Sequence, residues 1–312
     1  MFFRNLQLFR LTAGQDATAE AFQEQMSPYV FQACSALMPE SRGWIPPRGD
    51  DRLLYTLNQH WLAALGTEQK LLPASVVRQE VQQRAADLEA RSGFKPSRKR
   101  IRDLKDQVTD ELLPRAFSRY RTTFYWIDPV GGWLVIDAAT SKRADEVTEW
   151  LHKTSEALAF EPVKAARSPA SAMTEWLVER EGPAGFSIDR ECVLQSPLEE
   201  KSTVRYSHHS LVDTDEIRHH ITRDGKVPIQ LALTWEDRVS FVLTDKLEVR
   251  RVQFLDITRG DTESDADSAE EQFQSDFTLM TAMLGRFLND LLETLGGVEG
   301  EPRKTEEATA AQ

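Results

Sequence analysis

Basic side chains gather between residues 91 and 121, and their chemistry is that of phosphate binding. This stretch, RSGFKPSRKRIRDLKDQVTDELLPRAFSRYR, contains ten Lys or Arg and four Asp or Glu, so its formal charge is +6. The whole chain is acidic, with a net charge of −12. A local concentration of positive charge attracts a polyanion whatever the overall charge is. The alternative interpretation, a solvated helix with internally paired charges, is the more common role of a charge run.

The acidity of the chain lies mostly at its C-terminus. Residues 261–312 hold thirteen acids and three bases, a balance of −10. Subtracting this from −12 leaves −2 for residues 1–260. The body of the chain is therefore close to neutral, and its composition is compatible with a polyanionic partner.

A helix over residues 97–113 must position most of the basic residues. Apolar residues recur there at three- and four-residue intervals, which is typical of an amphipathic helix, and Pro114 should stop it at Leu113. Arg98, Arg102 and Lys105 fall on one flank of the apolar stripe. Acids lie on the far side, although Arg102 and Asp106 could pair across one turn. The stripe consists of Ile101, Leu104, Val108 and Leu112, and the acids are Asp103, Asp106 and Asp110.

Aromatic and basic residues interleave after Pro114. Phe117 and Tyr120 alternate there with Arg119 and Arg121. An exposed aromatic ring at such a place could stack on a base. For Phe117, a position in the core or in an oligomer contact is the favoured interpretation.

The remaining pattern predicts an α+β fold. Prolines 46 and 47 favour a rigid extended segment, and a capping box at Ser268 and Glu271 predicts a long final helix with an apolar seam. Strands are predicted at 3–11, 52–57, 60–65, 121–128, 132–138, 186–194, 202–207, 227–235, 238–244 and 247–256, and further helices near 18–26, 73–91, 142–158, 169–179 and 214–225.

These elements divide the chain into six regions. They are an N-terminal α+β region (1–72), a helical basic region (73–120), a hairpin-helix region (121–180), an antiparallel sheet region (181–260), a C-terminal helix (261–297) and a disordered acidic tail (298–312).

Composition and missing motifs exclude several classes of protein. Of the 312 residues, 40% are hydrophobic and 28% charged, and only two are cysteines, which predicts a globular protein of a reducing cytoplasm without membrane segments. No P-loop, GxGxxG, GxSxG or HExxH motif occurs. Adjacent histidines at 208–209 and 219–220 point apart on a helix and are poor joint ligands. We therefore expect no enzymatic activity, no metal and no cofactor.

Several stretches occur in the order and spacing found in the RdgC family of bacterial recombination-associated DNA-binding proteins, which the chain resembles to about Gly297. The most specific of them is LLPRAFSR. The stretches are FFRNLQLFRLT, GWIPPRG, KLLPASVV, ELLPRAFSRY followed by WID, MTEWL, GKVPIQLALTW and DFTLMTAMLGRFLNDLLETLGG.

The resemblance implies a non-enzymatic protein whose horseshoe-like monomer closes into a ring-shaped homodimer around DNA. It implies binding of double-stranded and single-stranded DNA with little sequence preference, restraint of the RecA recombinase, and a place at the nucleoid. Phe117 would then lie in the dimer interface. The residues expected to contact DNA are Lys95, Arg98, Lys99, Arg100, Arg102, Lys105, Arg115, Arg119, Arg205 and Lys226.

Two other functions remain open from the sequence. One is a protein-interaction regulator that binds the recombinase directly. In that case DNA binding would be secondary. The other is a metal-dependent DNA enzyme, for which no carboxylate cluster stands out.

His208 and His209 occupy a region where the family can carry lysines, and neutral imidazoles would attract phosphate less than lysines do.

Overall fold

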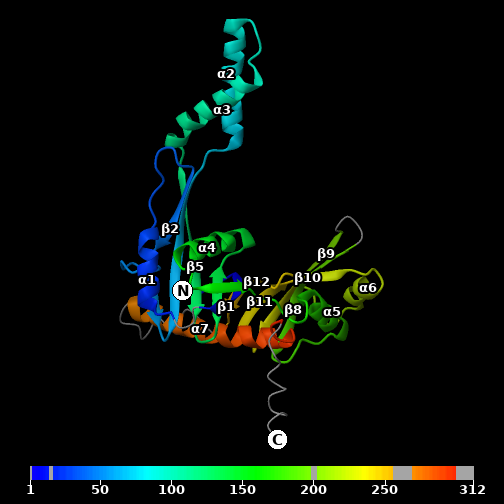
Figure 1. The fold of residues 1–312 in the computed structure, drawn as a ribbon. Helices are drawn as coiled ribbons and strands as arrows, with labels where there is room; N and C mark the ends of the chain where they lie inside the picture. Colours follow the sequence, from blue (N-terminus) through cyan, green and yellow to red (C-terminus); the bar gives the residue numbers. More distant parts are fainter. Residues whose placement is uncertain (1, 14–16, 198–201, 256–268, 300–312) are drawn as a thin grey trace. The chain divides into compact units, whose positions relative to one another are not determined.

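The fold is known from a computed structural model, which describes residues 2–13, 17–197, 202–255 and 269–299 (Figure 1). The chain forms two compact units. We call Met1–Ala19, Thr56–Leu62 and Tyr125–Gln312 the sheet unit, and Glu20–Tyr55 with Ala63–Phe124 the hairpin unit. The described residues contain seven α-helices and twelve strands, and nine pairs of these strands are antiparallel, so the predicted α+β class is confirmed.

The hairpin unit contains a small antiparallel sheet and two long helices. Strand β2 (Glu40–Ile45) pairs with β4 (His60–Lys70), with Glu40 opposite Gln69 and Ile45 opposite Ala64. Strand β3 (Leu54–Leu57) also pairs with β4. The short helix α1 (Ala19–Met26) precedes β2. Helices α2 (Ala74–Ser92) and α3 (Arg98–Leu112) follow β4, and the chain returns through a 3-10 helix (Leu113–Arg115) into β5 (Ser118–Asp128).

The sheet unit is built on the strand order β5-β6-β1-β12-β11-β10-β8-β9, with β7 on β1. Alternating apolar residues of β1 pair with β6 from Leu6 opposite Asp137 to Arg10 opposite Trp133. The strands are β1 (Leu6–Ala13), β6 (Trp133–Asp137), β7 (Ala159–Pro162), β8 (Phe186–Gln195), β9 (Thr203–Ser207), β10 (Val227–Trp235), β11 (Val239–Thr244) and β12 (Val249–Phe254).

Four helices belong to the sheet unit. They are α4 (Ser141–Thr154), α5 (Pro169–Glu179), α6 (Asp215–Thr222) and α7 (Ala269–Thr294). Figure 1 shows α7 running along one face of the sheet. Its apolar seam is buried there, and the ring of Phe287 lies 4.8 Å from that of Phe241 and 5.8 Å from that of Trp235. In the described ranges, none of the helices has the length and apolar composition needed to cross a membrane.

Most predicted elements occur within a few residues of their expected places, but some differ. The helix predicted at 142–158 ends at Thr154, because Ser155 is already extended, and strand β7 follows. Strand β1 begins at Leu6 and not at residue 3. Residues 40–42, which no prediction covered, extend the rigid segment into β2.

The capping residue Ser268 and most of the predicted tail lie outside the described residues. Two residues assigned to that tail are placed: Val298 forms a β-bridge with Ala165, and the backbone N–H of Glu299 donates to the carbonyl of Lys164. The six-region division of the chain stays a prediction.

Candidate nucleic-acid interface

The α2–α3 helical hairpin is held together by a small apolar core of its own. Val77 and Val81 of α2 pack against Leu104 and Val108 of α3. This core uses the predicted apolar stripe of α3, whose i, i+3 and i+4 positions share one face of a helix. Partly buried residues complete it, namely Leu72, Ala85, Leu88, Ile101 and Leu112.

One ion-pair system fastens the two helices side by side. The guanidinium of Arg84 on α2 donates to both carboxylate oxygens of Glu111 on α3, at 3.1 and 2.7 Å, and to Glu80 at 2.9 Å. Two parallel N–H···O bonds fix the direction as well as the distance. The contact with Arg84 also holds the pKa of Glu111 below its usual value. One of the four acids in the basic stretch is therefore neutralised by the neighbouring helix.

Six of the predicted DNA-binding residues lie on this hairpin, and all six are exposed. Among the described residues none of the six side chains makes an ion pair, so the predicted alternative of a self-paired helix is not the arrangement found. Arg102 and Asp106 in particular do not pair. The six are Lys95 in the loop before α3, and Arg98, Lys99, Arg100, Arg102 and Lys105 on α3 itself.

The six basic residues do not share one face. At 3.6 residues per turn, Arg98, Arg102 and Lys105 fall together on one flank of the apolar stripe. Lys99 falls on the outer face with Asp103 and its neighbouring acids, and Arg100 falls on the other flank. The grouping predicted for the first three is therefore compatible with the buried positions of α3.

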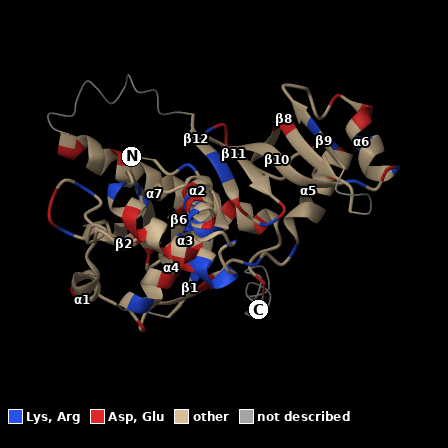
Figure 2. Cartoon of the chain, turned by 90° about the horizontal axis from the view of Figure 1, so that it is seen from above, with Lys and Arg blue, Asp and Glu red and all other residues tan. Residues whose placement is uncertain are grey.

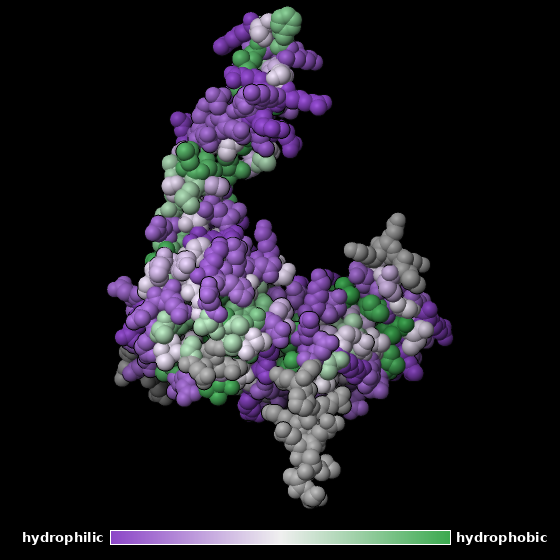
Figure 3. All heavy atoms as spheres, in the orientation of Figure 1, coloured by the Kyte–Doolittle hydropathy of each residue, from purple (hydrophilic) through white to green (hydrophobic). Residues whose placement is uncertain are grey.

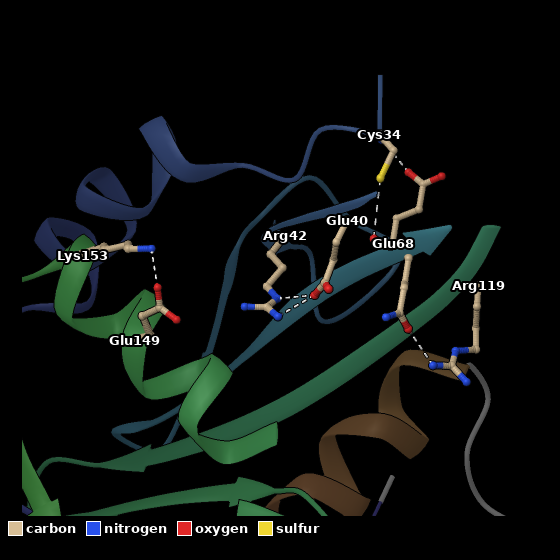
Figure 4. Close-up of polar contacts among 8 residues, drawn as sticks. Cys34, Glu40, Arg42, Glu68, Arg119, Glu149 and Lys153 are labelled. Atoms are coloured by element: carbon tan, nitrogen blue, oxygen red, sulfur yellow. Dashed lines mark hydrogen bonds and ion pairs between the residues drawn. The ribbon is translucent and has the colours of Figure 1, made fainter. Parts of the chain in front are cut away.

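Arg115, Phe117 and Arg119 lie at the base of the hairpin, about 22 Å from its tip along the fifteen residues of α3. Arg115 is in the 3-10 helix and is exposed. Arg119 is exposed on β5, where its guanidinium donates to the side chain of Gln69 at 2.8 Å (Figure 4). Phe117 is 85% exposed, and its carbonyl accepts from the N–H of Leu71 at 2.7 Å.

Phe117 is part of an exposed apolar patch. The N–H of Lys70 donates to the carbonyl of Pro39 at 2.8 Å, which places the segment before Pro39 beside Leu71 and Phe117. Figure 3 shows hydrophobic surface at the base of the hairpin. We call Leu37, Met38, Leu71 and Phe117 the apolar patch, and every one of these residues is exposed.

A buried carboxylate fixes the strand ends beneath this patch. Glu68 on β4 is 2% exposed and accepts from the N–H of Cys34 at 2.6 Å (Figure 4). It also accepts from the hydroxyl of Tyr120 at 3.0 Å. Hydrogen bonds from Ser118 and from the Cys34 backbone hold the pKa of Glu68 below its usual value. Donation to that carboxylate raises the pKa of Tyr120. Tyr120 therefore has a structural partner, and its ring still faces solvent.

The last two predicted DNA-binding residues belong to the sheet unit. Arg205 on β9 is exposed, opposite Val193 of β8. Lys226 has a side chain only 14% exposed, and its ammonium pairs with Asp224 at 3.3 Å. Asp224 also bonds His220 at 2.7 Å, and this contact lowers the pKa of Asp224. Figure 2 shows basic positions on β9 and β12 and acidic ones on α6. Of these two predicted DNA-binding residues, Arg205 is therefore the more accessible cation.

The histidine pairs do not converge on a metal site. His209 and His220 each contact the ring of Tyr206, at a centroid distance of 6.3 Å in both cases. Throughout the part of the chain that the structure describes, no group of three or more His, Cys, Asp or Glu side chains is arranged to hold a metal ion.

Sequence reasoning missed one residue that the hairpin displays. Phe94, in the loop between α2 and α3, is 80% exposed. A single aromatic residue in a loop leaves no periodic signal. The available signal was the absence of acids around it: from Glu89 to Asp103 the chain carries six basic residues and no acidic one between them.

The fold and this surface define a class: an α+β protein whose helical hairpin presents exposed cations that have no ion-pair partner in the described part of the chain. Comparison with known proteins makes the class specific. A family model described as "Putative exonuclease, RdgC" matches residues 1–298. The chain therefore belongs to the RdgC family, as its sequence motifs predict.

Curated relatives match over nearly their whole length. The recombination-associated protein RdgC of Dechloromonas aromatica (strain RCB) is 46% identical over 299 residues, which cover 95% of this chain and 98% of the relative. The protein of the same name from Janthinobacterium sp. (strain Marseille) is 46% identical, with 95% and 98% covered. That from Herminiimonas arsenicoxydans is 45% identical, with 96% and 100% covered. A role in recombination fits these relatives.

Proposed function

We propose that this chain binds double-stranded and single-stranded DNA through its phosphates, without reading the base sequence, and acts in recombination. The observation that carries the proposal is the set of exposed cations on the α2–α3 hairpin that have no ion-pair partner among the described residues. Cations that are free of carboxylates release counterions from DNA when they meet its phosphates, and this release supplies sequence-independent affinity. Contacts to phosphate alone carry no direct sequence information.

We further propose that two copies of the chain close into a ring around the DNA. Each horseshoe-like monomer would form one half of this ring. The apolar patch supports this step, because soluble monomers rarely expose several large apolar side chains together. A second copy of the chain would cover Phe117, Leu71 and their neighbours. Closure would add topological retention, which slows release from circular DNA without any new contact.

The proposed cellular role is restraint of the RecA recombinase at the nucleoid, in the cytoplasm. A ring that occupies DNA competes with a recombinase for the same strand. The membership of the RdgC family and the printed name of the relatives, recombination-associated protein, support this role.

The test compares retention of the full chain on circular and linear DNA of the same sequence after a rise in salt, with the oligomeric state measured in parallel. Encirclement predicts that the protein stays on the circle and slides off the linear form. Equal loss from both forms would refute the ring and leave ionic DNA binding in place. Absence of binding to either form at low salt would refute DNA binding itself.

A second candidate function is an exonuclease, which the description of the family model names. The discriminating assay incubates end-labelled linear DNA with the protein in Mg²⁺ or Mn²⁺, and in chelator. Intact DNA and unchanged binding in chelator support the proposed non-enzymatic function. Metal-dependent shortening of the strands would support the exonuclease instead.

A further inference from the structure

The loop that joins α2 to α3 is hydrogen-bonded to both helices. Gly93 caps α2 in the left-handed region, at φ 76°, and its N–H donates to the carbonyl of Glu89 at 2.8 Å. The hydroxyl of Ser92 accepts from the N–H of Phe94 at 3.4 Å. At the far side, Ser97 caps α3 by accepting from the N–H of Arg100 at 3.3 Å. Both ends of the loop are therefore fixed by hydrogen bonds to the adjoining helices.

Phe94 is presented to solvent from this fixed loop. Its side chain is 80% exposed, although a ring of this size is usually largely buried. Pro96 restricts the backbone two residues later. Figure 3 shows both hydrophobic and strongly hydrophilic surface at the outer end of the hairpin. An apolar ring exposed at this tip is positioned to contact a partner, because little of it contributes to the core.

The charge around Phe94 indicates what that partner is. Six cations and no acid lie between Glu89 and Asp103 in the sequence. A protein partner would have to be strongly acidic to meet this surface, whereas DNA offers phosphates for the cations and flat bases for the ring. The six cations are Arg91, Lys95, Arg98, Lys99, Arg100 and Arg102.

We propose that Phe94 stacks on an unpaired base of DNA while the cations beside it contact the adjoining phosphates. Every base has a π face, so such stacking tolerates any sequence. In an intact duplex the bases are stacked on each other and paired, and the ring has no free face to meet. The hairpin tip would therefore favour single strands and gapped duplexes over intact duplex. This inference rests on the proposed DNA binding and adds a preference for unpaired bases.

The experiment uses the full chain, as Phe94→Ala and Phe94→Trp, with three DNA probes of equal length: a single strand, an intact duplex and a gapped duplex. The single strand and the gap carry 2-aminopurine, whose fluorescence falls when its ring is stacked. We expect Phe94→Ala to weaken binding of the single strand and the gapped duplex by about 5-fold or more, from the usual loss of one stacked base. It should also remove the protein-induced quenching. Phe94→Trp keeps an aromatic ring at this position, so it should show wild-type affinity for these two probes and wild-type quenching.

Matched controls separate stacking from general damage. Val130, also exposed but in the β5–β6 turn, is changed to Ala and should leave all three affinities unchanged. Phe94→Ala should keep the wild-type melting temperature and, within about 2-fold, the affinity for intact duplex, because counterion release does not involve the ring.

Three results would overturn the inference, and they differ in whether the proposed DNA binding also fails. Unchanged single-strand affinity and quenching in Phe94→Ala would refute stacking while DNA binding stands. Equal weakening on all three probes would show that Phe94 does not sense unpaired bases. Failure of the wild-type chain to bind any probe would refute the proposed function as well.

Discussion

Neutralising the flank of α3 that carries Arg98, Arg102 and Lys105 should change the salt dependence of DNA binding by a calculable amount. Each phosphate contact contributes about 0.9 to the slope of log affinity against log salt. Changing the three residues to Gln should therefore lower the slope by about 2.7 if one hairpin contacts the DNA, and by about 5.4 if both hairpins of a dimer do. If one hairpin contacts the DNA, doubling the salt concentration should weaken DNA binding by the wild type about 6-fold more than DNA binding by the variant.

The substitutions are chosen so that the hairpin keeps its fold. All three side chains are exposed and make no ion pair with another described residue, and Gln is nearly as good a helix former as Arg or Lys. The assay is fluorescence anisotropy on duplexes of unrelated sequence across a salt series, with circular dichroism to check helix content. Lys142→Gln with Arg143→Gln, exposed positions at the start of α4, is the control and should leave the slope as it is. An unchanged slope in the triple variant would refute the assignment of this flank to DNA.

Three further predictions concern the supports of this surface. Leu104→Ala, in the hairpin core, should destabilise α2 and α3 by about 2–5 kcal/mol, seen as faster amide exchange confined to these helices, whereas Gln107→Ala should not. Phe117→Ser should raise the dissociation constant of the proposed dimer by about 10-fold or more in analytical ultracentrifugation, and an unchanged constant would contradict a dimer contact at Phe117. Because the pKa of Glu68 lies below its ordinary 4.5, its stabilisation is full above that pH and is lost as the pH falls through the lowered pKa. Denaturant midpoints of Glu68→Gln should therefore fall less on acidification than those of wild type, and parallel curves would contradict this.

Signals in neighbouring residues predicted α3 well, but they could not predict contacts between residues that are distant in the sequence. The predicted helix 97–113 is found as Arg98–Leu112 because Ser97 caps it and Pro114 follows it, and both signals lie in the adjoining residues. The Arg84–Glu111 pair joins residues of two helices, and periodicity within one helix says nothing about which charges meet across them. The ion pair of Lys226 with Asp224 escaped prediction for a different reason. The two residues are close in sequence, but whether their side chains meet depends on the turn between α6 and β10, which charge and periodicity do not describe.

The arrangement of charges on α3 ranks the predicted contacts. Arg84 neutralises Glu111. The other acids of α3, Asp103, Asp106 and Asp110, have no ion-pair partner within the described ranges, and helical periodicity groups them on the outer face. A phosphate backbone approaching that face would meet these carboxylates together with Lys99. One approaching the flank of Arg98, Arg102 and Lys105 would meet three cations on successive turns. DNA should therefore lie along that flank, and Lys99 and Arg100 should contribute less to affinity than their exposure alone indicates.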